Sequence, residues 1–160
     1  MSAGLPGRLR RAGLRDLDRV VPLWLAIGEH HAALDRAFEL NDAPEAEARE
    51  LVRALLRDPD QAAFLYEEEG RVLGLCIVGA ARARAVSRER ERAEIGDLGV
   101  APAHRRRGIG RRLVDEALAW TAQRGIERVS VRVAVANREG QAFWRALGFG
   151  DLVDVLCRRL

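Results

Sequence analysis

Arginines and glycines gather in one short stretch of the chain, residues 105–112. Gly108 and Gly110 follow three consecutive arginines, and an amphipathic, helix-like segment begins at Ile109. The first N–H groups of a helix have no partner within the helix and carry partial positive charge, so a glycine turn that exposes them favours an anion. Arginines are unfavourable at this end of a helix unless a negative group offsets them. We therefore predict that this turn binds a phosphate group.

Other interpretations of the same stretch explain less of it. Arg111 and Asp115 are four residues apart, so a solvated helix face paired with itself is an alternative, but it leaves the glycines unexplained. A Walker loop needs a lysine, and all 27 basic residues of this chain are arginines. A dinucleotide-binding fingerprint needs a small residue three positions after Gly110, where this chain has Leu113. The Walker loop is therefore excluded and the fingerprint is disfavoured.

A strand, a turn and a helix must position this stretch. The apolar segment before it ends at Val100 and is stopped by Pro102. The helix carries apolar residues at every third or fourth position until Gly125 supplies a C-cap. Alternating valines then predict a strand over residues 128–135. A strand, a helix and a strand of this length predict a right-handed crossover between two parallel strands.

Periodicity and turn residues predict the remaining elements. A helix is expected to begin after Asp16 as its N-cap, with Pro22 kinking or restarting it. Glu69 and Gly70 join two strands as an antiparallel hairpin. The other predicted elements are a first strand at residues 9–12, a second helix at 44–57, the hairpin strands at 63–68 and 72–81, a last helix at 139–147 and a last strand at 152–159.

The pattern Arg105-x-x-Gly108-x-Gly110 after a strand resembles the first signature of the GCN5-related N-acetyltransferase (GNAT) superfamily. A second stretch downstream is similar to another signature of that superfamily. It consists of Asn137, then Gln141-Ala142-Phe143-Trp144, then Leu147-Gly148-Phe149. Two motifs in this order and at this separation make the resemblance specific.

The resemblance implies an α/β (α+β) fold. The expected GNAT fold has a mixed central sheet of six to seven strands, mostly antiparallel, flanked by about four helices. One pair of parallel strands splays apart in this fold, and the pantetheine arm of acetyl-CoA lies in the gap. We expect a single domain over residues 1–160, with its core from about residue 8 to 160, because a chain of this length suits one hydrophobic core.

The resemblance also implies an activity, an acetyl-CoA-dependent N-acetyltransferase. Acetyl-CoA is the expected cosubstrate, and its acetyl group is expected to move to a primary amine by direct attack in a ternary complex. The acceptor is a small-molecule or peptide amine. A non-catalytic acyl-CoA-binding regulatory module is the alternative. The expected cofactor-binding residues are Leu98, Gly99, Val100, Arg105, Arg106, Arg107, Gly108, Ile109, Gly110, Arg111, Asn137 and Trp144.

Two carboxylates are candidates for the general base. Glu94 is the first, because it lies six residues before Val100, where members resembling histone acetyltransferases place a glutamate; a solvated strand residue is its alternative role. Asp97 is the second. Strand alternation points the two to opposite faces, so only one reaches the cleft unless a bulge intervenes. Trp144 stands where many members have a tyrosine that protonates the leaving thiolate, and an indole N–H cannot act as an acid.

Polar residues between the first two helices are expected near the acceptor, because this region shapes the acceptor pocket in the superfamily. His30 and His31 are adjacent, so they point about 100° apart and cannot share a metal as residues four apart can. We expect no metal site. The polar residues concerned are Glu29, His30, His31, Asp35, Glu39 and Asp42.

Composition disfavours other classes of protein. The pI is near 9.6, but 24 acidic residues leave a net charge of only +3, and 5% aromatic content offers few residues for base stacking, so no nucleic acid is expected. The longest apolar run, residues 20–27, is too short for a membrane span, and we expect a cytoplasmic protein without a membrane partner. Cys76 and Cys157 are expected to be buried free thiols. A homodimer is left open.

Overall fold

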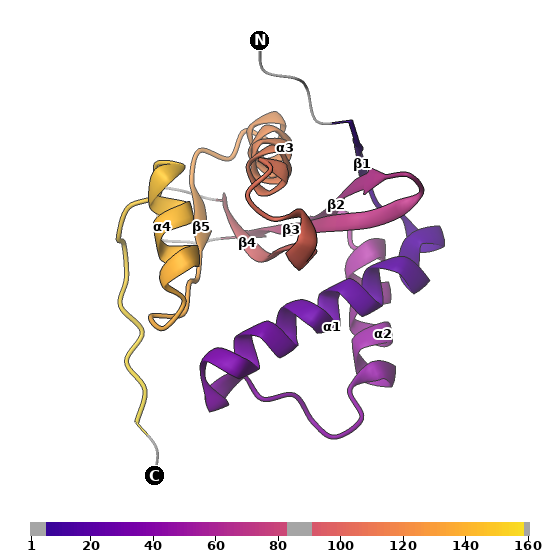
Figure 1. Cartoon of the computed structure of the whole chain (residues 1–160). Coiled ribbons are helices and arrows are strands. Elements are labelled where there is room, and N and C mark those ends of the chain that lie inside the picture. Colours follow the sequence, from indigo (N-terminus) through magenta and orange to yellow (C-terminus); the bar gives the residue numbers. More distant parts are fainter. Residues whose placement is uncertain (1–5, 83–90, 159–160) are drawn as a thin grey trace.

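A five-stranded sheet forms the centre of the molecule in a computed structural model that describes residues 6–82 and 91–158 (Figure 1). The strands are β1 (Arg8–Arg11), β2 (Gln61–Glu68), β3 (Arg71–Arg82), β4 (Glu91–Val100) and β5 (Val129–Val131). They lie in the order β1-β2-β3-β4-β5, and every pair is antiparallel except β4 and β5. The mixed sheet is as predicted, but the described residues form five strands and not six to seven.

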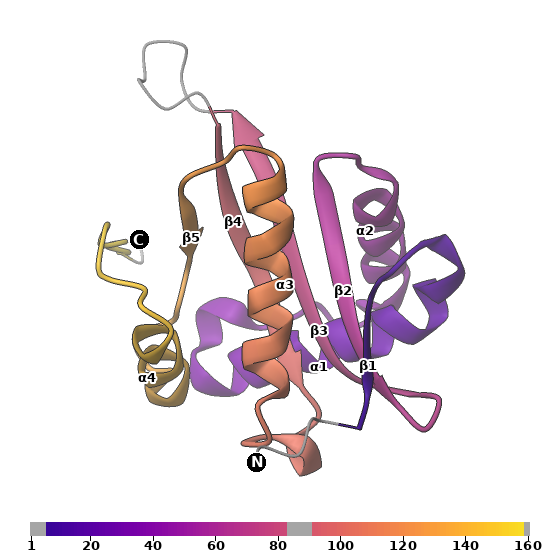
Figure 2. The ribbon, with the colours of Figure 1, turned by 90° about the horizontal axis from the view of Figure 1, so that it is seen from above.

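Four α-helices flank this sheet. They are α1 (Leu17–Leu34), α2 (Glu45–Arg57), α3 (Ile109–Gln123) and α4 (Arg138–Ala146). α1 and α2 lie on one face of the sheet, α3 lies on the other, and α4 stands beside β5 (Figures 1 and 2). Three short 3₁₀ turns complete the fold: η1 (Leu14–Asp16), η2 (Arg36–Phe38) and η3 (Pro102–His104).

The alternating side chains of β2 show how the sheet supports two cores. Phe64 and Tyr66 pack towards α3, while Ala63 and Leu65 pack towards α1 and α2. All four are almost completely buried. Because successive strand residues point to opposite faces, a strand covered on both sides must be apolar where it is covered, as β2 is from Ala62 to Tyr66.

The predicted hairpin is confirmed, whereas the first helix does not restart at Pro22, one of the two outcomes predicted for that residue. Glu69 and Gly70 both have positive φ, 51° and 76°, which suits the tight turn between β2 and β3. α1 runs without interruption through Pro22. Pro22 is exposed and lies close to the start of the helix, so it removes one early hydrogen bond without disturbing the packed face.

The C-terminal end departs most from the prediction. β5 is only three residues long, and the predicted last strand does not form within residues 152–158. This segment leaves the end of α4 and runs across the strand direction, so its backbone is not aligned with the edge of β5 (Figures 1 and 2). Cys157 is therefore exposed, contrary to expectation, whereas Cys76 is buried as expected.

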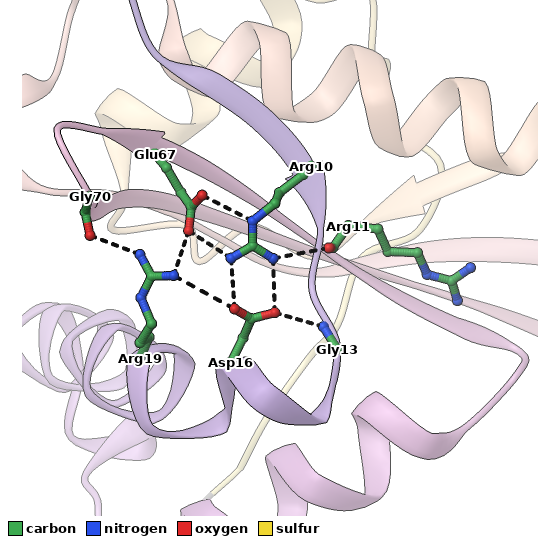
Figure 3. A network of polar contacts seen from close by, with 7 residues as sticks. All are labelled: Arg10, Arg11, Gly13, Asp16, Arg19, Glu67 and Gly70. Atoms are coloured by element: carbon green, nitrogen blue, oxygen red, sulfur yellow. Dashed lines mark hydrogen bonds and ion pairs between the residues drawn. The ribbon is translucent and has the colours of Figure 1, made fainter.

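A network of ion pairs holds the N-terminal end of the fold together (Figure 3). Arg10 on β1 donates two hydrogen bonds to Asp16, at 2.6 and 2.9 Å, and two to Glu67 on β2, at 2.7 and 2.9 Å. Arg19 on α1 also reaches Glu67, at 2.7 Å. Asp16 is the N-cap residue of α1, as predicted, but its carboxylate makes no capping hydrogen bond to that helix. It accepts instead from Arg10 and from the Gly13 N–H.

Candidate active site

A cleft of about 810 Å³ opens where β4 and β5 separate. The two strands pair only from Ala93 opposite Val129 to Ile95 opposite Val131. The next residue of β4, Gly96, is a bulge, because Ile95 and Asp97 face consecutive residues of β3. A bulge bends a strand and ends regular pairing, so the cleft begins at this point. Its walls come from β4, β5, α4, the end of α1 and the turn before α3.

The first turn of α3 lines this cleft. Gly108 is the N-cap residue of α3 and has a φ of +87°, a left-handed conformation that glycine adopts without steric cost. Gly110 lies against Phe143 of α4, close enough that a Cβ there would sit 3.4 Å from the ring. Arg106 is also left-handed, with φ of +62°, which costs a non-glycine residue about 1 kcal/mol or more. The turn therefore holds an unfavourable backbone conformation at the cleft.

The arginines of this turn do not all face the cleft. Arg105, Arg106 and Arg111 line it, and the Arg105 Nε also donates to the Val100 carbonyl at 3.1 Å. Arg107 is not among the described residues that line the cleft; its guanidinium lies 3.3 Å from Glu68. The sequence placed all four on a cofactor, and the structure brings three of them together.

The bulge at Gly96 also decides where the two candidate bases point. Glu94 lies opposite Gly79 of β3 and Asp97 lies opposite Ile77. Gly79 and Ile77 are two positions apart and share the face covered by α1, so Glu94 and Asp97 share it too. Regular alternation had placed them on opposite faces. Neither belongs to the cleft lining in the described chain, although their neighbours Ile95, Gly96 and Leu98 do.

Asp97 and Glu94 sit in different electrostatic surroundings. Burial raises the pKa of the Asp97 carboxyl, while the Trp24 indole N–H and the His31 side chain oppose that rise. The Trp24 Nε1 is shielded from solvent and meets full hydrogen-bond geometry with no atom of the described residues, so it is a weak partner for Asp97. Glu94 is more exposed and lies 3.4 Å from the Arg132 Nε of the segment after β5.

One face of α1 packs against this part of β4. A Cβ at Gly99 would lie 2.4 Å from Ile27 Cγ1, so only glycine permits this close approach. Trp24 and His31 lie three residues before and four residues after Ile27, on the same side of the helix. The sequence analysis did not connect these residues with Asp97, although their helical spacing was a signal that could have done so.

His30 marks the place where three elements converge on the cleft. The pKa of its imidazole is lowered by burial, then by Arg105 and His31, while Glu139 of α4 acts in the opposite direction. His30 and His31 both line the cleft. The end of α1, the arginine turn and the start of α4 therefore come together in the lining of the cleft. Among the described residues, no group of three metal-binding side chains gathers that could hold an ion.

Asn137 and Trp144 line the cleft from α4. Asn137 is the N-cap of α4, and its Oδ1 accepts a hydrogen bond from the Gly140 N–H at 2.9 Å. Trp144 is only 7% exposed and packs edge-on against Phe143 and Phe149, with ring centroids 5.2 and 5.1 Å apart. Both side chains therefore stabilise the cleft wall. Trp144 supplies no acid there, because an indole N–H does not act as an acid.

A family model described as the acetyltransferase (GNAT) family matches residues 27–149. The chain belongs to this family. The chain is 30% identical over 104 residues to an uncharacterised N-acetyltransferase, MJ1207, of Methanocaldococcus jannaschii. That match covers 65% of this chain and 46% of the relative, so the chain spans less than half the length of the curated relative it matches.

Solved structures share the GNAT fold over nearly the whole chain. A tetramutant of BH1408 from Bacillus halodurans has a TM-score of 0.83 at 17% identity, covering 96% of this chain and 99% of that one. The aminoglycoside N-acetyltransferase AAC(6')-Iy in complex with CoA has a TM-score of 0.81 at 17% identity, covering 100% and 98%. The aminoglycoside 6'-N-acetyltransferase AAC(6')-IG of Acinetobacter haemolyticus has a TM-score of 0.77 at 18% identity, covering 96% and 97%. At this identity the likeness concerns the fold.

In the described part of the chain, no helix has the length and apolar character of a membrane span.

Proposed function

We propose that this chain is an N-acetyltransferase that moves the acetyl group of acetyl-CoA to a primary amine within a ternary complex. One observation carries the proposal: the first turn of α3, with left-handed Gly108 as its N-cap, opens onto the cleft between β4 and β5. Unpaired N–H groups at a helix N-terminus suit the pyrophosphate, and a cleft of about 810 Å³ has room for a long, narrow ligand arm.

The cofactor-binding residues follow from this placement. Arg105, Arg106 and Arg111 surround the turn with positive charge that a phosphate group offsets. The backbone of Leu98 to Val100 lies on the β4 wall, beyond the bulge, where its N–H groups would stabilise the negative charge that develops on the thioester oxygen. Anchoring the carrier at one end and the carbonyl at the other makes the attack effectively unimolecular.

The acceptor must lose a proton before it attacks. An alkyl ammonium has a pKa near 10, so only about one part in 10³ is free amine at pH 7. The amine nitrogen then forms the new bond to the carbonyl carbon, the C–S bond breaks, and the thiolate leaves without a dedicated acid, since a thiol pKa is about 8.5. We propose that Glu94 or Asp97 receives the amine proton through water.

Glu94→Gln should lower turnover at neutral pH with little change in cofactor affinity; an unchanged pH–rate profile would exclude Glu94 from this role.

The acceptor side of the proposal rests on the region between α1 and α2. Glu29, Glu39 and Glu45 line a smaller hollow of about 390 Å³ there. A group of carboxylates near the end of α1 attracts cationic amines by long-range electrostatics. A small-molecule or peptide amine is therefore the proposed acceptor class. Solved aminoglycoside acetyltransferases, one of them in complex with sisomicin, share this fold.

The binding step is tested by thermal unfolding with and without acetyl-CoA. A ligand at about 100 times its Kd stabilises the folded state by about 2.7 kcal/mol, and Gly108→Asp should abolish that gain, because a side chain and a negative charge then intrude on the phosphate. Gly125→Asp is the matched control, since Gly125 is also left-handed, with φ of +71°, but follows the C-cap residue at the other end of α3. Stabilisation retained in Gly108→Asp would place the carrier elsewhere.

The catalytic step is tested by the release of free thiol from acetyl-CoA with a panel of amines. The enzyme should release thiol with at least one amine class and none without an amine. The alternative is a non-catalytic acyl-CoA-binding module. It is favoured by the buried Trp144, which stands where many family members have the tyrosine that protonates the leaving thiolate. That module should show the thermal stabilisation and release no thiol with any amine class.

A further inference from the structure

Positive charge outweighs negative charge along the cleft. Among the described residues, its lining holds five arginines and one carboxylate: Arg105, Arg106, Arg111, Arg132, Arg138 and Glu139. The first three belong to the glycine turn before α3, where the diphosphate of the carrier offsets them under the proposed function. Arg132 and Arg138 lie elsewhere in the lining, in the segment after β5 and at the start of α4. A second anion, beside the diphosphate, would therefore suit this cleft.

Arg132 stands where β4 and β5 separate. Their pairing ends at Val131, so Arg132 is the first residue on the β5 side of the gap, beside the Gly96 bulge of β4. Val131 and Val133 both pack against the core that α3 covers, so Arg132 between them points to the opposite face of the sheet. Its Nε lies 3.4 Å from Glu94 Oε1 on that face. Arg132 is therefore next to a candidate base.

The Arg132 guanidinium has unused donors. Its side chain is 81% exposed, and within the described residues its only polar contact is the ion pair with Glu94, which does not meet full hydrogen-bond geometry. An exposed ion pair of this kind adds little stability in water, so a ligand can separate it at small cost. The planar guanidinium can donate two parallel hydrogen bonds to a carboxylate. Arg132 is therefore free to bind the carboxylate of a ligand.

Glu94 and Arg132 present opposite charges side by side. A free amino acid carries its positive amine and its negative carboxylate on the same carbon, which is the complementary arrangement. With its carboxylate on Arg132, such a molecule has its amine on the sheet face that carries Glu94 and Asp97, the two candidates for the proton acceptor. A simple amine would leave Arg132 without an anion. The arrangement therefore favours an acceptor that carries both charges.

We propose that Arg132 binds the carboxylate of the acceptor, and that the acceptor is a free amino acid acetylated on its α-amine. This inference rests on the proposed acetyl transfer and names its substrate class. The α-ammonium gives its proton to Glu94 or Asp97 through water, its nitrogen bonds to the thioester carbonyl carbon, and the C–S bond breaks as CoA leaves as a thiolate. Arg132 takes no part in these bond changes. It holds the amine beside the thioester, so that the attack is effectively unimolecular.

The first test compares amino acids with their amides in the thiol-release assay. An amide keeps the side chain and the amine but lacks the negative charge. Its amine is also the less basic of the two, because no carboxylate stands beside it, so ionisation of the amine by itself favours the amide. We expect the opposite order. For the preferred side chain, kcat/KM should be about tenfold or more higher for the amino acid than for its amide.

Variants of the two arginines locate the carboxylate. Arg132→Met should lower kcat/KM for the amino acid by about 10- to 100-fold and leave that for the amide nearly unchanged, with Arg132→Lys in between. Arg138→Met is the matched control, since it removes the same charge from the cleft lining, and it should keep the wild-type ratio of amino acid to amide. A preference lost in Arg138→Met but kept in Arg132→Met would overturn the assignment.

Two failures of this assay have different meanings. If the wild type turned over amino acids and amides equally well, the acetyl transfer would stand and the carboxylate site would be wrong. If no amine of any class released thiol, the proposed reaction would be wrong, and this inference would fall with it.

The second test measures binding without turnover. CoA carries no acetyl group, so CoA and an amino acid form a complex with the protein that cannot react. The unfolding temperature of the CoA-saturated protein should rise with millimolar amino acid and stay constant with its amide. Arg132→Met should lose the rise caused by the amino acid and keep the one caused by CoA, which also shows that the variant is folded. An equal rise with the amino acid in Arg132→Met and the wild type would overturn the role of Arg132.

Discussion

Two aspartates of this protein, Asp16 and Asp97, show how the same carboxyl behaves in two regions of the molecule. At the N-terminal end, hydrogen bonds from Arg10, and also one from the Gly13 N–H, lower the pKa of Asp16 to about 2. Beside the cleft, burial raises the pKa of Asp97, and the weakly placed Trp24 N–H only partly offsets it. One carboxylate is stabilised by its surroundings, and the other is destabilised by them.

The surroundings of Asp16 stabilise the fold, whereas those of Asp97 are of the kind found around reactive groups. Asp16 is 2% exposed and its charge is matched by bidentate hydrogen bonds, which is what a buried ion needs. Asp97 lacks such a cationic partner at hydrogen-bond distance among the described residues. A carboxyl with a raised pKa is a better proton acceptor once ionised, so perturbed groups of this kind occur often at functional sites.

The largest expected effect comes from removing the arginine of the stabilising region. Arg10→Met removes the four hydrogen bonds that Asp16 and Glu67 accept from Arg10 and leaves Arg19 as the cation near both carboxylates, which should lower the free energy of unfolding by about 3 kcal/mol. Urea unfolding at pH 7 measures the change. Arg36→Met is the control, because Arg36 and Glu39 form an exposed pair worth less than about 1 kcal/mol. Equal losses in both variants would contradict the contrast between the two regions.

Asp16→Asn should cost about 2 kcal/mol at pH 7, with a definite pH dependence. The pKa falls from 3.8 to about 2 on folding, so the ionised carboxylate stabilises the protein fully above pH 3.8. That contribution is lost as the pH falls from 3.8 towards 2, and the variant should approach the wild type over this window. Asp151→Asn, at an exposed ion pair with Arg145, should show little change at any pH. If the stability lost in Asp16→Asn stayed constant down to pH 2, the lowered pKa of Asp16 would not be its cause.

The opposite sign is expected at Asp97. Its pKa is raised on folding, so the folded state holds the proton more tightly and stability falls as the pH rises from about 3.8 to the folded value. Asp97→Asn removes this loss and should stabilise the protein by about 1 kcal/mol at pH 8, while lowering turnover if Asp97 takes part in the reaction. Thermal unfolding at pH 4 and 8 measures it, with the exposed Asp115→Asn as control. If Asp97→Asn were less stable than the wild type at pH 8, the ionised Asp97 would stabilise the protein as Asp16 does, and the contrast between the two carboxylates would be wrong.

The smallest effect concerns the weak partner of Asp97. Trp24→Phe keeps the ring on the α1 face but removes the indole N–H that lowers the pKa of Asp97. The pKa of Asp97 should therefore rise further in this variant. Carboxyl chemical shifts followed through a pH titration measure this directly. A pKa that falls in Trp24→Phe would show that the indole does not assist the carboxylate.

Local signals were enough for much of the fold and for the glycine turn before α3. Helix periodicity and the Glu69-Gly70 turn placed their elements within a residue or two, because short-range sterics and burial of one face decide them. The signature with Gly108 and Gly110 pointed to the turn that lines the cleft. Asp16 is the N-cap residue of α1 as predicted, but the hydrogen bonds of its side chain were not foreseen, because Arg10, which donates to Asp16, is also held by Glu67 only when β1 pairs with β2.

The sequence by itself determined the order of helices and strands, the glycine turn at the start of α3 and the family, since these depend on residues close together along the chain. The tertiary structure decided that Glu94 and Asp97 share one face, because the bulge at Gly96 adds a residue to β4 that no local pattern requires. It also decided that Arg107 turns to Glu68 and that residues 152–158 stay outside the sheet. These outcomes depend on which backbone segments lie next to each other in space, and strand alternation in the sequence does not predict that.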